Sequence, residues 1–230
     1  MSKTRSGETG GDDGLAAKPS VPSRRRWWKR VILPAVPDVV ALLVKQGEIA
    51  EVAMVRFDAW SHGGGDEAAQ SVRDCVEHGA YEARRDLLSA LQAALSTPVD
   101  QEDLYVLSER TDRILTEAKS AVREADVLHW PPDEHAATMS GYLLDGVRNL
   151  LAGFRLLLKD PERAGREADD ASEAVRHVER AYREAMAGLQ DADDLRGVLA
   201  AQEIYRRYHR IAEAVVSVAD RLWYAVLRGA

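Results

Sequence analysis

Hydrophobic residues recur every three or four positions along most of this chain, which is the spacing of one face of a helix. The first such face begins near residue 38 and comprises Val39, Leu42, Leu43, Gln46, Ile49, Ala53, Phe57 and Trp60. Gly63-Gly64-Gly65 interrupts the pattern and predicts the end of this helix. A second helix is predicted over about residues 66–96.

A corner at Pro98 carries local signals for the end of one helix and the start of the next. Pro98 disfavours helical angles at Thr97, so the second helix should stop before it. Asp100 can cap the following helix with its carboxylate. Glu102 and Asp103 then lie in the first turn, where the helix dipole favours negative charge.

The third helix has alternating steps of three and four, the rhythm of a coiled coil. Val99 and Leu104 stand at the two positions of a hydrophobic staple at its start. Its expected buried seam comprises Leu104, Leu107, Thr111, Ile114, Ala118, Ala121, Ala125 and Leu128. Trp130-Pro131-Pro132 should end it.

Three further helices are predicted. The fourth covers about residues 133–159, and Pro161 can occupy the first position of the fifth, which reaches about residue 190. Asp191-Ala192-Asp193-Asp194 offers caps for the sixth, which runs to about residue 228. The pattern therefore predicts an all-α domain over residues 38–230, built as two antiparallel three-helix bundles at about 38–130 and 133–228.

The two halves align weakly at an offset of 101 to 102 residues. Leu107, Ile114 and Ala121 then meet Tyr208, Val215 and Leu222. Internal duplication is one interpretation. The alternative is that any two heptad patterns resemble each other.

Composition agrees with a helical protein that has a real core. Hydrophobic residues make up 46% of the 230 positions but aromatic residues only 6%, so Leu, Ala and Val must fill the interior. Cys75 is the single cysteine, which excludes an internal disulfide and is typical of a protein in a reducing compartment. We expect it to be a small core residue. With no signal-like segment and no long apolar run, we expect a cytoplasmic protein.

Charge divides the chain into a basic beginning and an acidic body. Residues 1–30 carry a net charge of +5 and the rest −12. An acidic body argues against nucleic-acid binding. Residues 1–23 are polar and predict a disordered tail. The basic charge is concentrated in the linker at 24–37, in Arg24, Arg25, Arg26, Trp27, Trp28, Lys29 and Arg30.

Two interpretations of this basic segment stay open. It is either an anchor on an anionic membrane surface or a basic entry to the fold whose Trp rings cover helix ends. Sedimentation with anionic vesicles separates the two.

No nucleophile motif, phosphate loop or dinucleotide fingerprint is present, so we expect a non-enzymatic protein. Three His residues have a carboxylate four positions away, a spacing at which both side chains share one helix face: His78 with Glu82, His177 with Glu173, and His209 with Glu213. Because acids are frequent in this chain, such His–carboxylate pairs arise by chance. We therefore expect them to lie on a solvated surface and not to form a metal site.

The corner also carries a family resemblance. Residues 87–112 resemble a PhoU-related bacterial family of phosphate transport regulators, or Pit accessory proteins, which include domains of unknown function. The hallmark is a T-P-(hydrophobic)-D-R-E-D corner, in which Gln101 here replaces the Arg. Residues 42–46 and 77–80 resemble further family motifs, and residues 178–186 and 221–226 resemble its actinobacterial branch. The resemblance covers about residues 25–228.

The resemblance implies two three-helix bundles and a cytoplasmic partner of a Pit-type phosphate permease. It also implies iron or other divalent metal held by E-x-x-x-D pairs, whose positions here are Glu77, Asp112, Glu179, His209 and Glu213. The second acid of each pair, expected four positions later, is replaced: Tyr81 stands four positions after Glu77, Thr116 four after Asp112 and Arg183 four after Glu179. We therefore do not expect a tightly bound cluster.

The leading hypothesis is an accessory protein of a phosphate permease, peripheral at the inner face of the cell membrane. The alternatives are a metal-binding helical bundle and a structural scaffold that forms homo-oligomers.

Overall fold

The structure is a computed structural model and describes residues 38–191 and 193–229. The predicted tail (1–23) and basic linker (24–37) lie outside the described residues. The described elements are α1 (Val39–Ser61), α2 (Gly65–Asp74), the π-helical segment η2 (Cys75–Ala80), α3 (Tyr81–Ala93), α4 (Gln101–Leu128), α5 (Glu134–Leu156), α6 (Pro161–Gly188), the short 3₁₀ turn η3 (Leu189–Asp191) and α7 (Leu195–Gly229).

Six long helices result, because α2, η2 and α3 follow one another without a break. Asp74 and Tyr81, which flank η2, both keep right-handed helical angles. The predicted all-α fold of six helices is confirmed.

The second helix nevertheless differs from the prediction at both ends and in the middle. It begins at Gly65 and ends at Ala93, three residues early, because Ala94 is already extended at φ −77° and ψ 123°. The π-helical turn was not predicted either, since a three-four spacing carries no signal for it. The fourth predicted helix also ends early, at Leu156 rather than at residue 159.

An aspartate caps the start of nearly every long helix. The Asp100 carboxylate accepts a hydrogen bond from the Glu102 amide at 2.8 Å, which confirms the predicted corner cap. Asp38, Asp133, Asp160 and Asp194 accept in the same way from amides of α1, α5, α6 and α7. Each cap satisfies an amide that the helix leaves without a partner.

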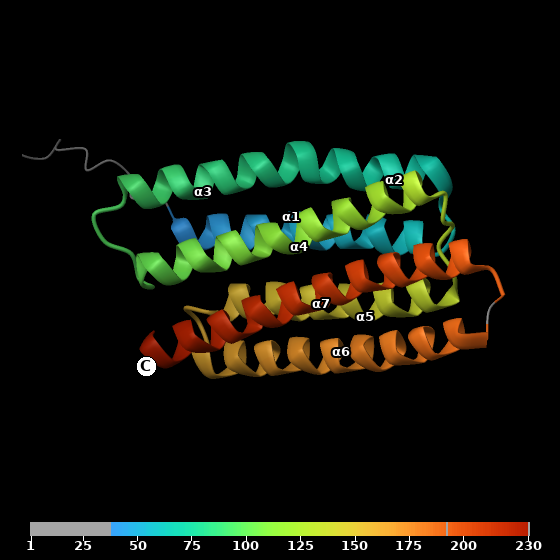
Figure 1. Ribbon diagram of the computed structural model, residues 1–230. Helices are drawn as coiled ribbons and strands as arrows, with labels where there is room; N and C mark the ends of the chain where they lie inside the picture. Colours follow the sequence, from blue (N-terminus) through green and yellow to red (C-terminus); the bar gives the residue numbers. More distant parts are fainter. Residues whose placement is uncertain (1–37, 192, 230) are drawn as a thin grey trace, which may run out of the picture. The chain divides into compact units, whose positions relative to one another are not determined.

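The helices form two groups that share one core. Figure 1 shows α1, α2, α3 and α4 in one group and α5, α6 and α7 in the other. Between the groups α1 packs on α5, and α4 packs on α7. The predicted α4 seam is buried from Leu104 to Ala125, whereas Leu128 at the helix end is 39% exposed. Whether the two groups arose by duplication stays a prediction.

Glycine allows α5 to approach its neighbours closely. A Cβ at Gly153 would lie 2.5 Å from Cδ2 of Leu222 on α7 and 3.3 Å from the carbonyl oxygen of Ala164 on α6. Leu222 is fully buried and has no free space to retreat into. Gly141, on the same helix, has open space at the corresponding position.

These two glycines give a matched test of the packing. Gly153→Ala should lower the free energy of unfolding by about 1–3 kcal/mol, because the added methyl overpacks the core. Gly141→Ala should instead raise it by about 0.5–1 kcal/mol, because alanine favours a helix. Urea denaturation of the two variants measures both changes, and equal effects would show that α5 does not pack as described.

Candidate functional site

The Pro98 corner is joined to the end of α7 by a buried carboxylate. Asp103 is fully buried, and its Oδ1 lies 2.6 Å from Nη2 of Arg221. Arg228 contributes a second guanidinium, 3.7 Å from Oδ2. These contacts are ion pairs and lack the angles of aligned hydrogen bonds. A buried charge needs such partners, so Asp103 joins the corner to these two Arg residues of α7.

Two further acids of the corner, Glu102 and Asp100, form ion pairs with the same Arg residues. Arg221 lies 3.2 Å from Glu102, and Arg228 lies 2.9 Å from Asp100. The Asp100 carboxylate raises the pKa of Arg228. Both guanidinium groups lie over the Tyr224 ring, at 4.9 Å and 5.6 Å from its centroid. The acids of the corner motif therefore fasten α4 to α7.

Further polar contacts continue along α4 and α7. Arg110 donates a hydrogen bond to the carbonyl oxygen of Ser217 at 2.5 Å. Arg207 donates to Glu117 and Glu124, and its hydrogen bond to Glu124 raises its pKa. On the other side of α4, the buried Gln46 amide donates to the carbonyl oxygen of Ser108 at 2.9 Å. Gln46 belongs to one of the motifs of the resemblance, and its role here is to join α1 to α4.

A groove between the second helix and α4 contains four positions identified by the resemblance. Glu77 and Asp112 line it together with Tyr81 and Thr116, the residues that replace the second acids. The cavity has a volume of about 480 Å³. The structure therefore brings these four residues together, although they come from two separate helices.

Basic side chains share this groove, which we call the α3–α4 groove. Arg84 binds Asp112 at 2.7 Å. Glu77 is bound by Arg123 at 2.7 Å and lies 3.8 Å from Lys119. Arg85 also lines the groove and forms no ion pair with a described residue. Sequence reasoning missed these cations, although Lys119 stands two helical turns after Asp112 and so shares its face.

The other three candidate ligands are not part of this groove. His209 stacks on Tyr182, with ring centroids 5.1 Å apart, and its Nε2 lies 3.7 Å from Glu213. Glu179 is half-buried on α6.

The donors of the described part do not fit a metal centre. Within residues 38–191 and 193–229, no group of three or more His, Cys, Asp or Glu side chains is placed to hold a metal ion. In the groove, cations already neutralise both carboxylates. The metal role of the five residues stays a prediction, which metal analysis of the purified protein can test.

Cys75 lies in a separate apolar groove beside α1, with Ile49, Val52 and His78. Burial raises the pKa of its thiol. The thiol is therefore mostly protonated at neutral pH and is a poor nucleophile. The prediction of a small packing residue agrees with this position, although Cys75 is half-buried rather than fully in the core.

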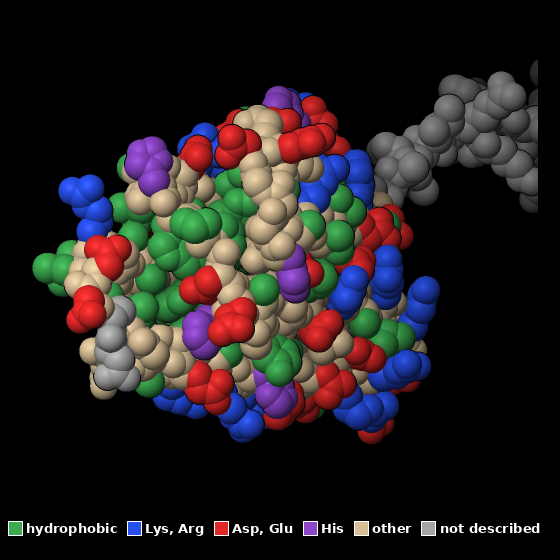
Figure 2. Space-filling model, turned by 90° about the vertical axis from the view of Figure 1, so that its right-hand side faces the viewer, with side chains coloured by type: hydrophobic (Ala, Val, Ile, Leu, Met, Phe, Trp, Pro, Cys, Tyr) green, Lys and Arg blue, Asp and Glu red, His purple; other side chains and the backbone are tan. Residues whose placement is uncertain are grey.

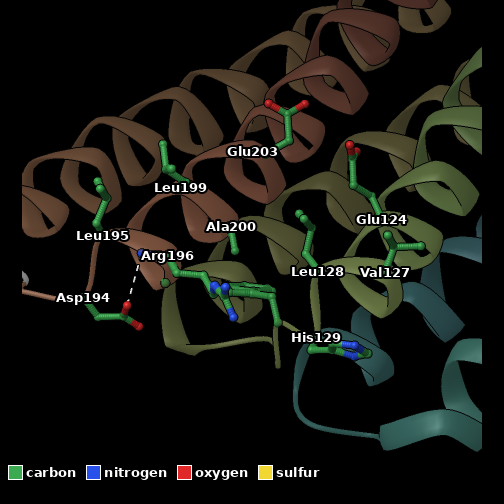
Figure 3. Close-up of a pocket in the computed structure, with 12 residues that line it drawn as sticks. Glu124, Val127, Leu128, His129, Asp194, Leu195, Arg196, Leu199, Ala200 and Glu203 are labelled. Carbon is green, nitrogen blue, oxygen red and sulfur yellow. Dashed lines mark hydrogen bonds between the residues drawn. The ribbon is translucent and has the colours of Figure 1, made fainter.

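A larger, apolar pocket lies where α4 ends and α7 begins. Its volume is about 850 Å³. In Figure 3, Leu195, Leu199 and Glu203 lie along one face of α7, and Val127, Leu128 and Glu124 of α4 face them. Asp194 caps α7 at the edge of the pocket by accepting from the Arg196 amide.

Large hydrophobic side chains of this pocket are open to solvent. Val127 is 77% exposed, Leu195 71% and Leu199 57%. Figure 2 shows this end of the helices, with hydrophobic side chains at the surface and acidic side chains among them. Exposed apolar side chains gathered at one place are typical of a contact surface. The sequence pattern does not predict this exposed apolar surface, because the exposure of these side chains depends on where the neighbouring helices end.

Comparison with known proteins identifies the fold. No family model and no curated protein sequence matches the chain. PhoU from Pseudomonas aeruginosa superposes with a TM-score of 0.69 at 18% identity, over 84% of this chain and 97% of that one. The chain has the PhoU-like fold.

Two proteins of Shewanella oneidensis MR-1 share this PhoU-like fold. One PhoU-like protein superposes with a TM-score of 0.66 at 15% identity, over 83% of this chain and 99% of that one. The other is described as a candidate PhoU-like phosphate regulatory protein. It superposes with a TM-score of 0.58 at 16% identity, over the same shares of the two chains.

The corner of this PhoU-like fold can be tested through its two neighbouring acids. Asp103→Ala should lower the free energy of unfolding by about 3 kcal/mol, because it leaves two guanidinium groups beside an empty buried site. Glu102→Ala should cost less than about 1 kcal/mol, because this carboxylate is 71% exposed in its contact with Arg221. Chemical denaturation measures both, and similar losses would contradict the role of Asp103.

Proposed function

We propose that this protein is a non-enzymatic phosphate regulatory protein of the PhoU type, and an accessory protein of a Pit-type inorganic phosphate permease. The observation that carries the proposal is the structural match, which spans 97–99% of the PhoU-like chains. The Pro98 corner supports it independently, because it resembles the signature of the Pit accessory proteins and its acids have a structural role here.

The apolar pocket at the ends of α4 and α7 is the proposed contact surface for the permease. Its lining combines exposed Leu and Val with the carboxylates of Glu124, Asp194 and Glu203 and the guanidinium of Arg196. Two of these carboxylates already have Arg partners, Glu124 in Arg207 and Glu203 in Arg206. Cytoplasmic loops of membrane proteins carry an excess of Lys and Arg. An amphipathic, basic cytoplasmic segment of the permease therefore matches the exposed apolar side chains of this surface, and its cations can pair with Asp194.

The proposed location is the cytoplasm, at the inner face of the cell membrane. Among the helices of residues 38–191 and 193–229, none is long and apolar enough to span a bilayer. We propose that the basic segment with Trp27 and Trp28 holds the protein at anionic lipid, which vesicle sedimentation with and without residues 24–30 tests.

Three exposed leucines of α7 provide a matched test of the contact surface. Leu195→Asp with Leu199→Asp should reduce co-purification with a tagged phosphate permease at least about tenfold, because apolar anchors dominate such contacts. Leu227→Asp is the control, because Leu227 lies on the same helix outside the pocket and is 68% exposed, close to the 71% of Leu195. The midpoint temperatures of thermal unfolding should be the same for the double variant and the control.

Deletion of the gene should also change phosphate uptake through the permease. The proposal is wrong if the wild-type protein never co-purifies with a phosphate permease and its deletion leaves uptake unchanged. If light scattering shows oligomers that the Leu195 and Leu199 changes dissociate, the pocket instead joins copies of this chain, as the scaffold hypothesis predicts.

A further inference from the structure

The α3–α4 groove is basic in a protein whose folded body is acidic. Its lining holds three cations, Arg84, Arg85 and Lys119, against the carboxylates of Glu77 and Asp112. The net charge of the lining is therefore +1, whereas residues 31–230 together carry −12. Cations gathered in a cavity, against the overall charge of the molecule, focus the field on an anionic ligand.

The donors in the groove suit an oxyanion with several oxygens. Arg84 and Arg85 come from α3 and Lys119 from α4, so donors reach the cavity from both of its walls. Arg presents a planar fork of N–H groups that matches the oxygens of a phosphate, and Lys adds a compact charge. Tyr81 and Thr116 line the same cavity, and a hydroxyl group is a further hydrogen-bond donor.

We propose that the α3–α4 groove binds an oxyanion of the phosphate class, either inorganic phosphate or a short phosphate chain. The cavity of about 480 Å³ has room for either ligand. Arg85 is the primary donor, because it faces the cavity without an ion-pair partner among the described residues. Lys119 is the second, because its contact with Glu77 is long, at 3.8 Å.

The negative charge of Asp112 predicts the direction in which phosphate affinity changes when that charge is removed. Asp112 holds Arg84 at 2.7 Å, and its negative charge repels an entering anion. Removing this charge should therefore strengthen anion binding. A metal ion would respond in the opposite way, because it would lose a ligand.

The inference goes beyond the proposed regulatory function and uses a different surface. The permease contact is assigned to the ends of α4 and α7, whereas this groove lies between α3 and α4. Either proposal can therefore fail without the other, because one is measured by co-purification and the other by ligand binding to the purified protein.

Calorimetric titration of the full chain with inorganic phosphate, at low ionic strength and neutral pH, tests the site. Arg85→Gln with Lys119→Gln should weaken phosphate binding at least about tenfold, because two charge-assisted contacts are lost. Arg166→Gln is the control, because Arg166 is also an exposed helical Arg, paired with Glu162 on α6 away from the groove. It should leave the affinity unchanged.

Asp112→Asn should tighten phosphate binding about threefold, the effect of one unit charge about 6 Å away in a water-like medium. Titration with tripolyphosphate at about 0.15 M salt, where its larger charge is screened, identifies the source of the ligand: tighter binding than inorganic phosphate indicates a chain, and equal or weaker binding indicates the single ion.

Two results would overturn the proposal. The first is an absence of binding of both ligands to the wild-type protein. The second is binding that the Arg85 and Lys119 changes leave intact, because the anion would then occupy another place. Circular dichroism of each variant separates loss of binding from loss of folding.

Discussion

The contact between α4 and α7 holds the two helical groups together. The buried carboxylate of Asp103 is the most constrained group in this contact. A charge inside a protein is tolerated only beside a partner, and its partners here are Arg221 and Arg228, more than 100 residues later in the chain. Arg110 and Arg207 continue polar contacts along the same pair of helices. Sliding α4 along α7 would separate all of them together.

Local chemistry made much of this fold predictable. Asp100 and the Pro98 turn sit within one helical turn of each other, so their roles could be inferred from neighbouring residues alone. The seam from Leu104 to Ala125 follows from helix period and is buried as expected. The π-helical turn at Cys75–Ala80 was missed because the three-four spacing used to predict the helix carries no signal for it.

The candidate sites were predictable only in part, because they depend on which helices lie side by side. The resemblance located Glu77 and Asp112, and the structure places both in one groove. Their cationic partners Arg84 and Arg123 each come from the opposite helix, a pairing that periodicity within one helix does not contain. The apolar pocket was missed for a related reason. Leu195 and Leu199 belong to the helical pattern of α7, but the pattern does not show that they lie where α4 ends and are therefore not covered by it.

The ion pairs of the groove have a consequence for any anion that enters it. Asp112 already occupies Arg84, so it acts as a tethered competitor that is always present at a fixed, high local concentration. An anion held by Arg85 and Lys119 gains Arg84 as a third donor only by displacing this carboxylate, and it loses that contact when the carboxylate returns. For the proposed anion site, this competition favours weak, rapidly reversible occupancy over tight retention of the ligand.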